Sequence, residues 1–142
     1  MRLTDLVERI SDKRYRCGVC QWGCTLNVGS VGRCQVRVGV DSGIAILNDG
    51  LISAAHVGPI EDHRFWHLLP GTSVLSLGSW GYAFPEDQNR GQYARIPEDP
   101  AKRRRLEPDR AAQFALEKLC RGVVWTYSDP AVSFEYVRDL LQ

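Results

Sequence analysis

The chain of 142 residues is long enough for one domain or two small ones. Its apolar content of 44% and charged content of 25% are those of an ordinary soluble globular protein. A net charge of +1 gives no sign of a nucleic-acid partner or an acidic membrane surface, and no stretch approaches the roughly 18 apolar residues of a membrane span. We therefore expect a cytoplasmic protein with no membrane association.

The N-terminus predicts a short amphipathic helix over residues 3–11. Leu3, Leu6, Val7 and Ile10 recur at helical spacing, and residues 11–13 end the periodic pattern. The same segment lacks an apolar run of signal-peptide length, which argues against export to an oxidising compartment.

Four of the five cysteines lie close together, at Cys17, Cys20, Cys24 and Cys34, with the spacing C-x2-C-x3-C-x9-C. Thiolates that converge on one point bind zinc or an iron–sulfur cluster, and the glycines around them allow tight backbone turns. Two disulfides or four unligated thiols are the alternatives, and a reducing compartment disfavours the disulfides. We predict a metal site at these four cysteines, with Cys120 outside it as a small packed side chain.

Short β-like runs follow the cysteines, at residues 35–38, 44–47 and 51–57. Between the last two, Asn48, Asp49 and Gly50 accept positive φ and predict a hairpin turn. Residues 14–58 therefore predict a small antiparallel β unit that a metal clips together. Such a unit buries little apolar surface, so the bound metal would supply much of its folding free energy.

The second half predicts a strand at 73–78, a polar loop at 82–107, a helix at 108–119, a strand at 122–127 and a helix at 132–141. The order strand, helix, strand, helix indicates parallel strands. The predicted fold class is thus α+β. Residues 1–71 would hold the N-terminal helix, the metal-binding β unit and a connector, and residues 72–142 a partial parallel βαβα fragment.

Several segments, from about residue 16 onward, match one family in order. They are residues 16–20 with Cys24, 32–37, 55–61 (AHVGPIE), 67–71 (HLLPG), 76–78 (SLG) with Gly81, 125–130 (WTYSDP) and 134–136 (FEY). On these segments the chain resembles the radical SAM enzymes of the AmmeMemoRadiSam system, which are relatives of the pyruvate formate-lyase activating enzymes. The resemblance implies descent from a (β/α)6 barrel whose 4Fe–4S cluster reduces S-adenosylmethionine to a 5′-deoxyadenosyl radical.

The cluster motif of that family, G-C-N-F-x-C-x-x-C-Q-N, has lost its cysteines here. Residues 81–89 read GYAFPEDQN, in which Gly81, Phe84, Gln88 and Asn89 match and Tyr82 stands in place of the first cysteine. Tyrosine, proline and carboxylates cannot replace three thiolates on iron. Two of the six βα units are present, which implies a truncated barrel with an open edge.

The turn after the second strand carries Asp129, where the resemblance implies a carboxylate for the ammonium group of S-adenosylmethionine. We expect at most a vestigial cofactor contact at Asp129 and no catalytic residue. S-adenosylmethionine is not an expected cofactor, and a protein without enzymatic activity is the preferred interpretation.

We therefore expect a metal-binding protein derived from a radical SAM enzyme that serves as an interaction or assembly module. The ancestral setting favours an iron–sulfur cluster, whereas a small β unit in need of a stabilising ion favours zinc, which we prefer. The alternative is one component of a split radical SAM enzyme, with a partner protein or a second copy covering the open barrel edge.

A third hypothesis is a zinc ribbon that binds nucleic acid through the basic run at residues 102–105. Acidic residues dilute that run and no aromatic residues are interleaved with it, so a solvated loop face is the preferred interpretation. His56, His63 and His67 are expected to be packed structural imidazoles rather than ligands or bases.

Overall fold

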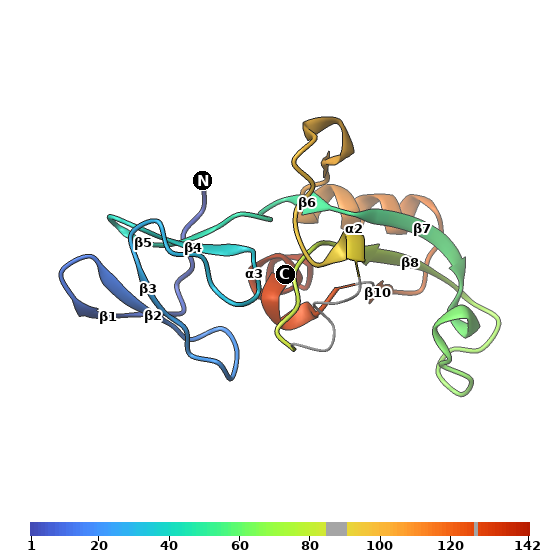
Figure 1. The fold of residues 1–142 in the computed structure, drawn as a ribbon. Coiled ribbons are helices and arrows are strands. Elements are labelled where there is room, and N and C mark those ends of the chain that lie inside the picture. The colour runs from blue at the N-terminus through green and yellow to red at the C-terminus, as the bar shows by residue number, and fades with distance from the viewer. Residues whose placement is uncertain (85–90, 127) are drawn as a thin grey trace.

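The computed structural model describes residues 1–84, 91–126 and 128–142, and it has a mixed α+β architecture of small sheets and two helices. Figure 1 shows the strands β1 to β5 together at one side of the molecule, and α2 beside the strands β7 and β8 at the other. Within the described ranges the strands form no closed barrel. No helix in these ranges has the length and apolar character needed to cross a membrane.

The first sheet is antiparallel, in the order β1 (Val7–Ser11), β2 (Arg14–Cys17), β3 (Thr25–Asn27). Side chains alternate along β2: Tyr15 and Cys17 are buried, whereas Arg14 and Arg16 are exposed. This two-residue period places the first cysteine on the inner face of the sheet.

The helix expected over residues 3–11 is wrong, since β1 occupies most of that range. A tight turn at Lys13, which has φ of +56°, folds β1 back onto β2 and pairs Glu8 with Arg16. Backbone pairing with β2 therefore overrides a helical spacing of only four apolar residues, which is a weak signal for so short a segment.

The next hairpin, β4 (Arg37–Val40) with β5 (Gly43–Ile46), is antiparallel, and β5 is buried throughout. Gly39 lies so close to the first sheet that a Cβ there would be 2.2 Å from the carbonyl oxygen of Asn27. The absence of a side chain at Gly39 therefore allows the hairpin to lie directly against β3.

The hairpin expected around residues 48–50 is wrong, although a turn is present there with Gly50 at φ of +65°. Strand β5 pairs with β4, whereas the following strand β6 (Leu51–Ile52) pairs with β9 (Arg104–Arg105). The turn thus carries the chain from one sheet to another.

The second large sheet has the order β10 (Val123–Trp125), β8 (Ser73–Gly78), β7 (Ala54–Pro59). Strands β8 and β10 are parallel, as the sequence predicts, and α2 (Pro108–Glu117) lies between them in the chain. Strand β7 joins β8 in antiparallel register. Side chains from this sheet, β6, α2 and the C-terminal helix form one core: Ile52, Leu75, Leu77, Ala111, Ala115 and Tyr136.

Short 3-10 helices complete the described chain: η1 (Ile60–His63), η2 (Gly91–Tyr93), η3 (Pro100–Lys102) and η4 (Pro130–Ser133). The final helix α3 (Phe134–Leu140) follows η4 directly, so the helix expected at 132–141 is present with a 3-10 start. The motif positions 85–89 and Tyr127 lie outside the described residues.

Candidate metal centre

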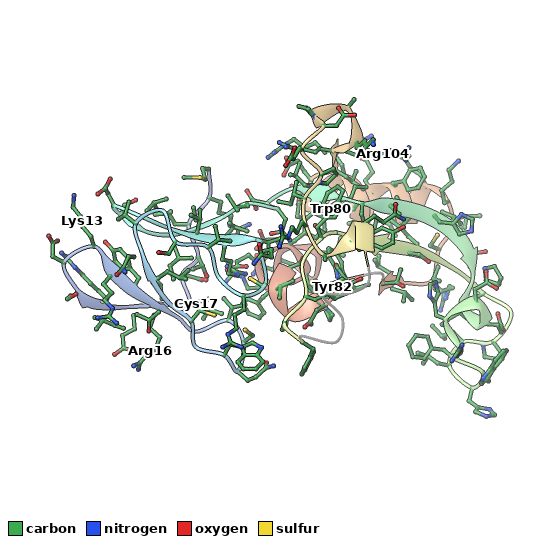
Figure 2. All side chains as sticks on the ribbon, in the orientation of Figure 1. Lys13, Arg16, Cys17, Trp80, Tyr82 and Arg104 are labelled. Carbon is green, nitrogen blue, oxygen red and sulfur yellow. The ribbon has the colours of Figure 1, made fainter. Side chains whose placement is uncertain are left out.

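The four clustered cysteines line one small cavity, which we call the four-cysteine cavity. Cys17 is the last residue of β2, Cys20 and Cys24 lie on the loop to β3, and Cys34 precedes β4. The cavity measures about 10 Å³, roughly the space of one water molecule. Figure 2 labels Cys17 near the inner end of the first sheet. The four cysteines, which lie close together in the sequence, therefore also border a common space in the fold.

Two apolar clusters meet at this cavity. Cys17 packs with Tyr15, Leu26 and Ile44 in the core of the first sheet, with Cys24 at its margin. Cys34 packs with Val36, Trp80, Ala83 and Val132, with Cys20 at its margin. The sulfur atoms therefore lie between the N-terminal strands and segments from the second half of the chain.

Burial keeps the most enclosed of these thiols neutral. Desolvation raises the pKa of Cys17, and it raises the pKa of Cys34 to about 11, although the nearby Arg37 guanidinium opposes both shifts. A metal that binds here must displace these protons, so its affinity would rise with pH.

The side chains of all five cysteines are free thiols, and none of them forms a disulfide. Within the described ranges, no three His, Cys, Asp or Glu side chains are already placed closely enough to hold a metal ion. A bound ion would therefore have to draw the sulfurs inward from the walls of the cavity. The metal site stays a prediction.

A buried ion pair adjoins the four-cysteine cavity through Arg37. The Arg37 guanidinium, which lines the cavity, donates to both carboxylate oxygens of Glu135, at 3.0 and 2.6 Å, and to the Val132 carbonyl at 3.2 Å. Both side chains are only 2% exposed, and the Thr4 hydroxyl also donates to Glu135. Sequence reasoning missed this pair, since nothing local links positions 98 residues apart.

The segment after β8 packs against the cysteine loop next to Cys34. The Trp22 indole N–H donates to the Ala83 carbonyl, and the Arg33 guanidinium stacks over the Trp22 ring at 4.3 Å. Gly81 has φ of +96°, and a Cβ there would lie 2.8 Å from the Cys34 carbonyl oxygen and 2.8 Å from the Val36 side chain. Gly81 therefore permits the close approach of this segment to the cysteine loop.

We expect Gly81→Ala to destabilise the protein more than Gly29→Ala does, by about 1–3 kcal/mol in urea unfolding. Both glycines have positive φ, but a Cβ at Gly29 meets nothing within 4 Å. The difference between the variants thus isolates steric contact with Cys34 and Val36 from the cost of the backbone conformation. Equal losses would mean that the cysteine loop yields to an added methyl group.

Asp129 has structural hydrogen bonds. Its carboxylate accepts from the backbone N–H of Ala131, which caps η4, and from the N–H of Ala83 at 3.3 Å. The neighbouring Ser128 hydroxyl accepts from Ser79 N–H and from the Trp125 indole. The turn at Asp129 therefore fastens the end of β10 to the segment after β8, and its expected cofactor contact stays a prediction.

The three histidines lie away from the four-cysteine cavity. His63 Nε2 is 2.5 Å from the Ser76 hydroxyl, which fits a structural imidazole. His56 and His67 are exposed, so the expectation of a packed side chain is wrong for both. Cys120 is half-buried against the core of the second sheet, as predicted.

The basic run at residues 102–105 is partly committed to intramolecular contacts. Arg103 donates to the carbonyls of Pro97 and Glu98, and Arg105 pairs with Glu107 at 2.6 Å. Two of its four cations are therefore engaged within the loop, which weakens the hypothesis of a nucleic-acid interface.

The chain is 28% identical over 141 residues to a protein of Methanocaldococcus jannaschii that bears the name Uncharacterized protein MJ0808. The match covers 98% of this chain and 42% of the relative, so the chain spans less than half of the relative's length. No protein family compared with the chain matches it, and no solved structure does. The name of the relative states no activity.

Proposed function

We propose that the protein binds one metal ion or cluster through Cys17, Cys20, Cys24 and Cys34 and uses it to fasten its N-terminal strands to the rest of the chain. The observation that carries this proposal is the convergence of four cysteines from three separate segments on one cavity. Thiolates are the ligands that zinc and iron–sulfur clusters share. Cys34 is packed in an apolar cluster with Trp80 and Val132, which supports a structural role for the metal.

Zinc is the preferred occupant. The cavity is small, and the strands around it form short sheets that gain most from one closed tetrahedral centre. A cluster with four cysteine ligands is the alternative, because it uses the same donor set. Metal analysis of anaerobically purified protein should find about one zinc per chain. A brown protein that contains iron and sulfide would show that the occupant is an iron–sulfur cluster and not zinc.

The resemblance to radical SAM enzymes supports descent without radical chemistry. Tyr82, which replaces the first motif cysteine, is buried, and Asp129 serves in backbone hydrogen bonds. We expect no 5′-deoxyadenosine after anaerobic reduction with S-adenosylmethionine. Stoichiometric 5′-deoxyadenosine would overturn the non-catalytic part of the proposal while leaving metal binding intact.

The proposed role as an interaction module is supported by an exposed apolar loop between η1 and β8. Its large side chains are 42–62% exposed: Phe65, Trp66, Leu68 and Leu69. Contiguous apolar side chains at a surface are typical of protein contact sites. Replacing Trp66 and Leu68 by serine should therefore abolish recovery of a specific partner while leaving the melting temperature unchanged.

A second candidate function is that of a component completed by another polypeptide. Strand β10 ends the order of its sheet, and a hollow of about 170 Å³ lies beside it, lined by Val123, Trp125, Val137, Leu140 and Leu141. The relative carries further polypeptide beyond the matched region, which supports this alternative. Co-purification of a chain that protects the amides of β10 from hydrogen exchange would favour it, and a monomer with exchanging β10 amides would count against it.

A further inference from the structure

Arg37 carries an unused hydrogen-bond donor beside the four-cysteine cavity. Its two terminal nitrogens donate to Glu135 and to the Val132 carbonyl, whereas its Nε–H has no hydrogen-bond partner among the described residues. The side chain is 2% exposed, and the Nε atom itself is shielded from solvent. A buried donor without a partner costs free energy. Because bulk solvent does not reach Nε, its partner has to be a group of the protein or an enclosed water molecule.

The sulfur of Cys34 is the acceptor that the packing around Arg37 favours. Arg37, Cys34 and Val132 all line the four-cysteine cavity. Cys34 and Val132 also pack in one apolar cluster, and the Val132 carbonyl accepts from the guanidinium at 3.2 Å. One residue of η4 therefore contacts both the cysteine and the arginine.

The turn that carries Cys34 folds back towards Arg37. The Gly32 N–H donates to the Arg37 carbonyl at 2.8 Å, which closes the turn. A Cβ at Gly32 would lie 3.6 Å from that carbonyl oxygen and 3.7 Å from Cys34 Sγ. The Cys34 sulfur thus lies at the closed end of the turn, close to the backbone of Arg37.

Hydrogen-bond donors already act on two of the thiols. Desolvation raises the pKa of Cys17, and a hydrogen bond from the Val19 N–H opposes it. At Cys34, desolvation is opposed in the same way by the Val36 N–H. The positive charge of Arg37 also favours the thiolate form of both cysteines. Donors that act on a sulfur before a metal is bound stabilise the form that binds the metal.

We propose that Arg37 is a positioning residue of the metal centre, and that its Nε–H donates to the metal-bound thiolate of Cys34. This assignment rests on the metal binding proposed above. Four thiolates around one zinc ion carry a net negative charge, and burying that charge requires donors to compensate it. A guanidinium N–H supplies a charge-assisted hydrogen bond for this purpose. Since the same guanidinium binds Glu135 on α3, it would link the metal ligands to the C-terminal helix.

Nuclear magnetic resonance of the cadmium-loaded protein tests the hydrogen bond directly. Cadmium binds soft thiolate ligands as zinc does, and a spin-active cadmium isotope couples to protons across an N–H···S bond. In the full-length protein the Arg37 Nε–H signal, assigned through its own side-chain resonances, should show this coupling. Its exchange with solvent should be about tenfold or more slower than in the metal-free protein.

The rate of zinc release to a chelator gives a second readout. The double variant Arg37→Met/Glu135→Leu lacks the donor and should release zinc about tenfold faster than the unmodified protein. Glu135→Gln is the matched control: it keeps Arg37 and should release zinc at the unmodified rate, although the charge that it leaves unpaired makes it the less stable variant. If Arg37 were important only for stability, the order of the two release rates would be reversed.

Three results would overturn the assignment alone: a cadmium-loaded protein without the coupling, transfer of magnetisation from an enclosed water to the Nε–H, or equal rates of zinc release from the double variant and the unmodified protein. If the double variant does not fold, the coupling in the unmodified protein decides the question. A protein that takes up neither zinc nor cadmium would overturn the metal site together with the assignment, so metal content tells the two failures apart.

Discussion

Replacement of Cys34 by serine is expected to reduce bound metal from about one equivalent per chain to less than a tenth. Cys34 is a buried thiol and lies in the cluster that joins the N-terminal strands to Trp80 and Val132. Serine keeps the size of the side chain but loses the soft thiolate donor. Metal analysis of the purified variant measures the effect.

The loss of metal should also unfold one part of the molecule preferentially. The β1–β3 sheet has short strands and a small core, whereas β8 and α2 share a larger one. In the Cys34→Ser variant, hydrogen exchange of amides in β1 to β3 should approach the unprotected rate while amides of β8 and α2 stay protected. Chelation of the metal from the unmodified protein should give the same pattern.

Cys120→Ser is the matched control, since this cysteine lies at the margin of the other core and outside the four-cysteine cavity. It should keep its metal and the exchange pattern of the unmodified protein. Full metal content in Cys34→Ser, or an equal loss of metal in Cys120→Ser, would contradict a metal site at the four-cysteine cavity.

Replacement of Glu135 by glutamine should cost about 3–5 kcal/mol of unfolding free energy, because it leaves the Arg37 guanidinium charged in a buried site. Two direct hydrogen bonds join these side chains, and both are 2% exposed. Urea unfolding measures the change. Asp5→Asn is the control: it breaks the exposed pair with Arg138 and should have a far smaller effect.

The double variant Arg37→Met/Glu135→Leu should recover most of the loss, because it removes both charges together. A double variant as unstable as the single one would show that packing, rather than an unpaired charge, causes the loss. The metal content of Glu135→Gln should stay unchanged. A loss of stability without a loss of metal distinguishes the role of the ion pair from that of the metal.

The ion pair predicts a dependence of stability on pH. Burial alone would raise the pKa of Glu135, but the hydrogen bonds from Arg37 and Thr4 outweigh it, so the pKa lies below the ordinary 4.5. The stabilising contribution is therefore complete above pH 4.5 and is lost as the pH falls through the lowered pKa. Glu135→Gln should be less sensitive to acid than the unmodified protein in this window.

Local sequence determined several parts of this protein. Pro108 and the apolar spacing after it predict α2, which begins at that residue. The apolar run at residues 73–78 predicts β8, and the order of elements predicts its parallel pairing with β10. The spacing of Cys17, Cys20, Cys24 and Cys34 predicts a shared cavity, because short loops hold such residues close together.

Only the tertiary structure decided the rest. Residues 3–11 carry a helical spacing, yet the turn at Lys13 and pairing with β2 make residues 7–11 a strand. The partnership of β6 with β9 and that of Arg37 with Glu135 join segments far apart in the chain. Such contacts depend on how whole elements pack, since the free energy of burying Arg37 and Glu135 together exists only once both halves are folded.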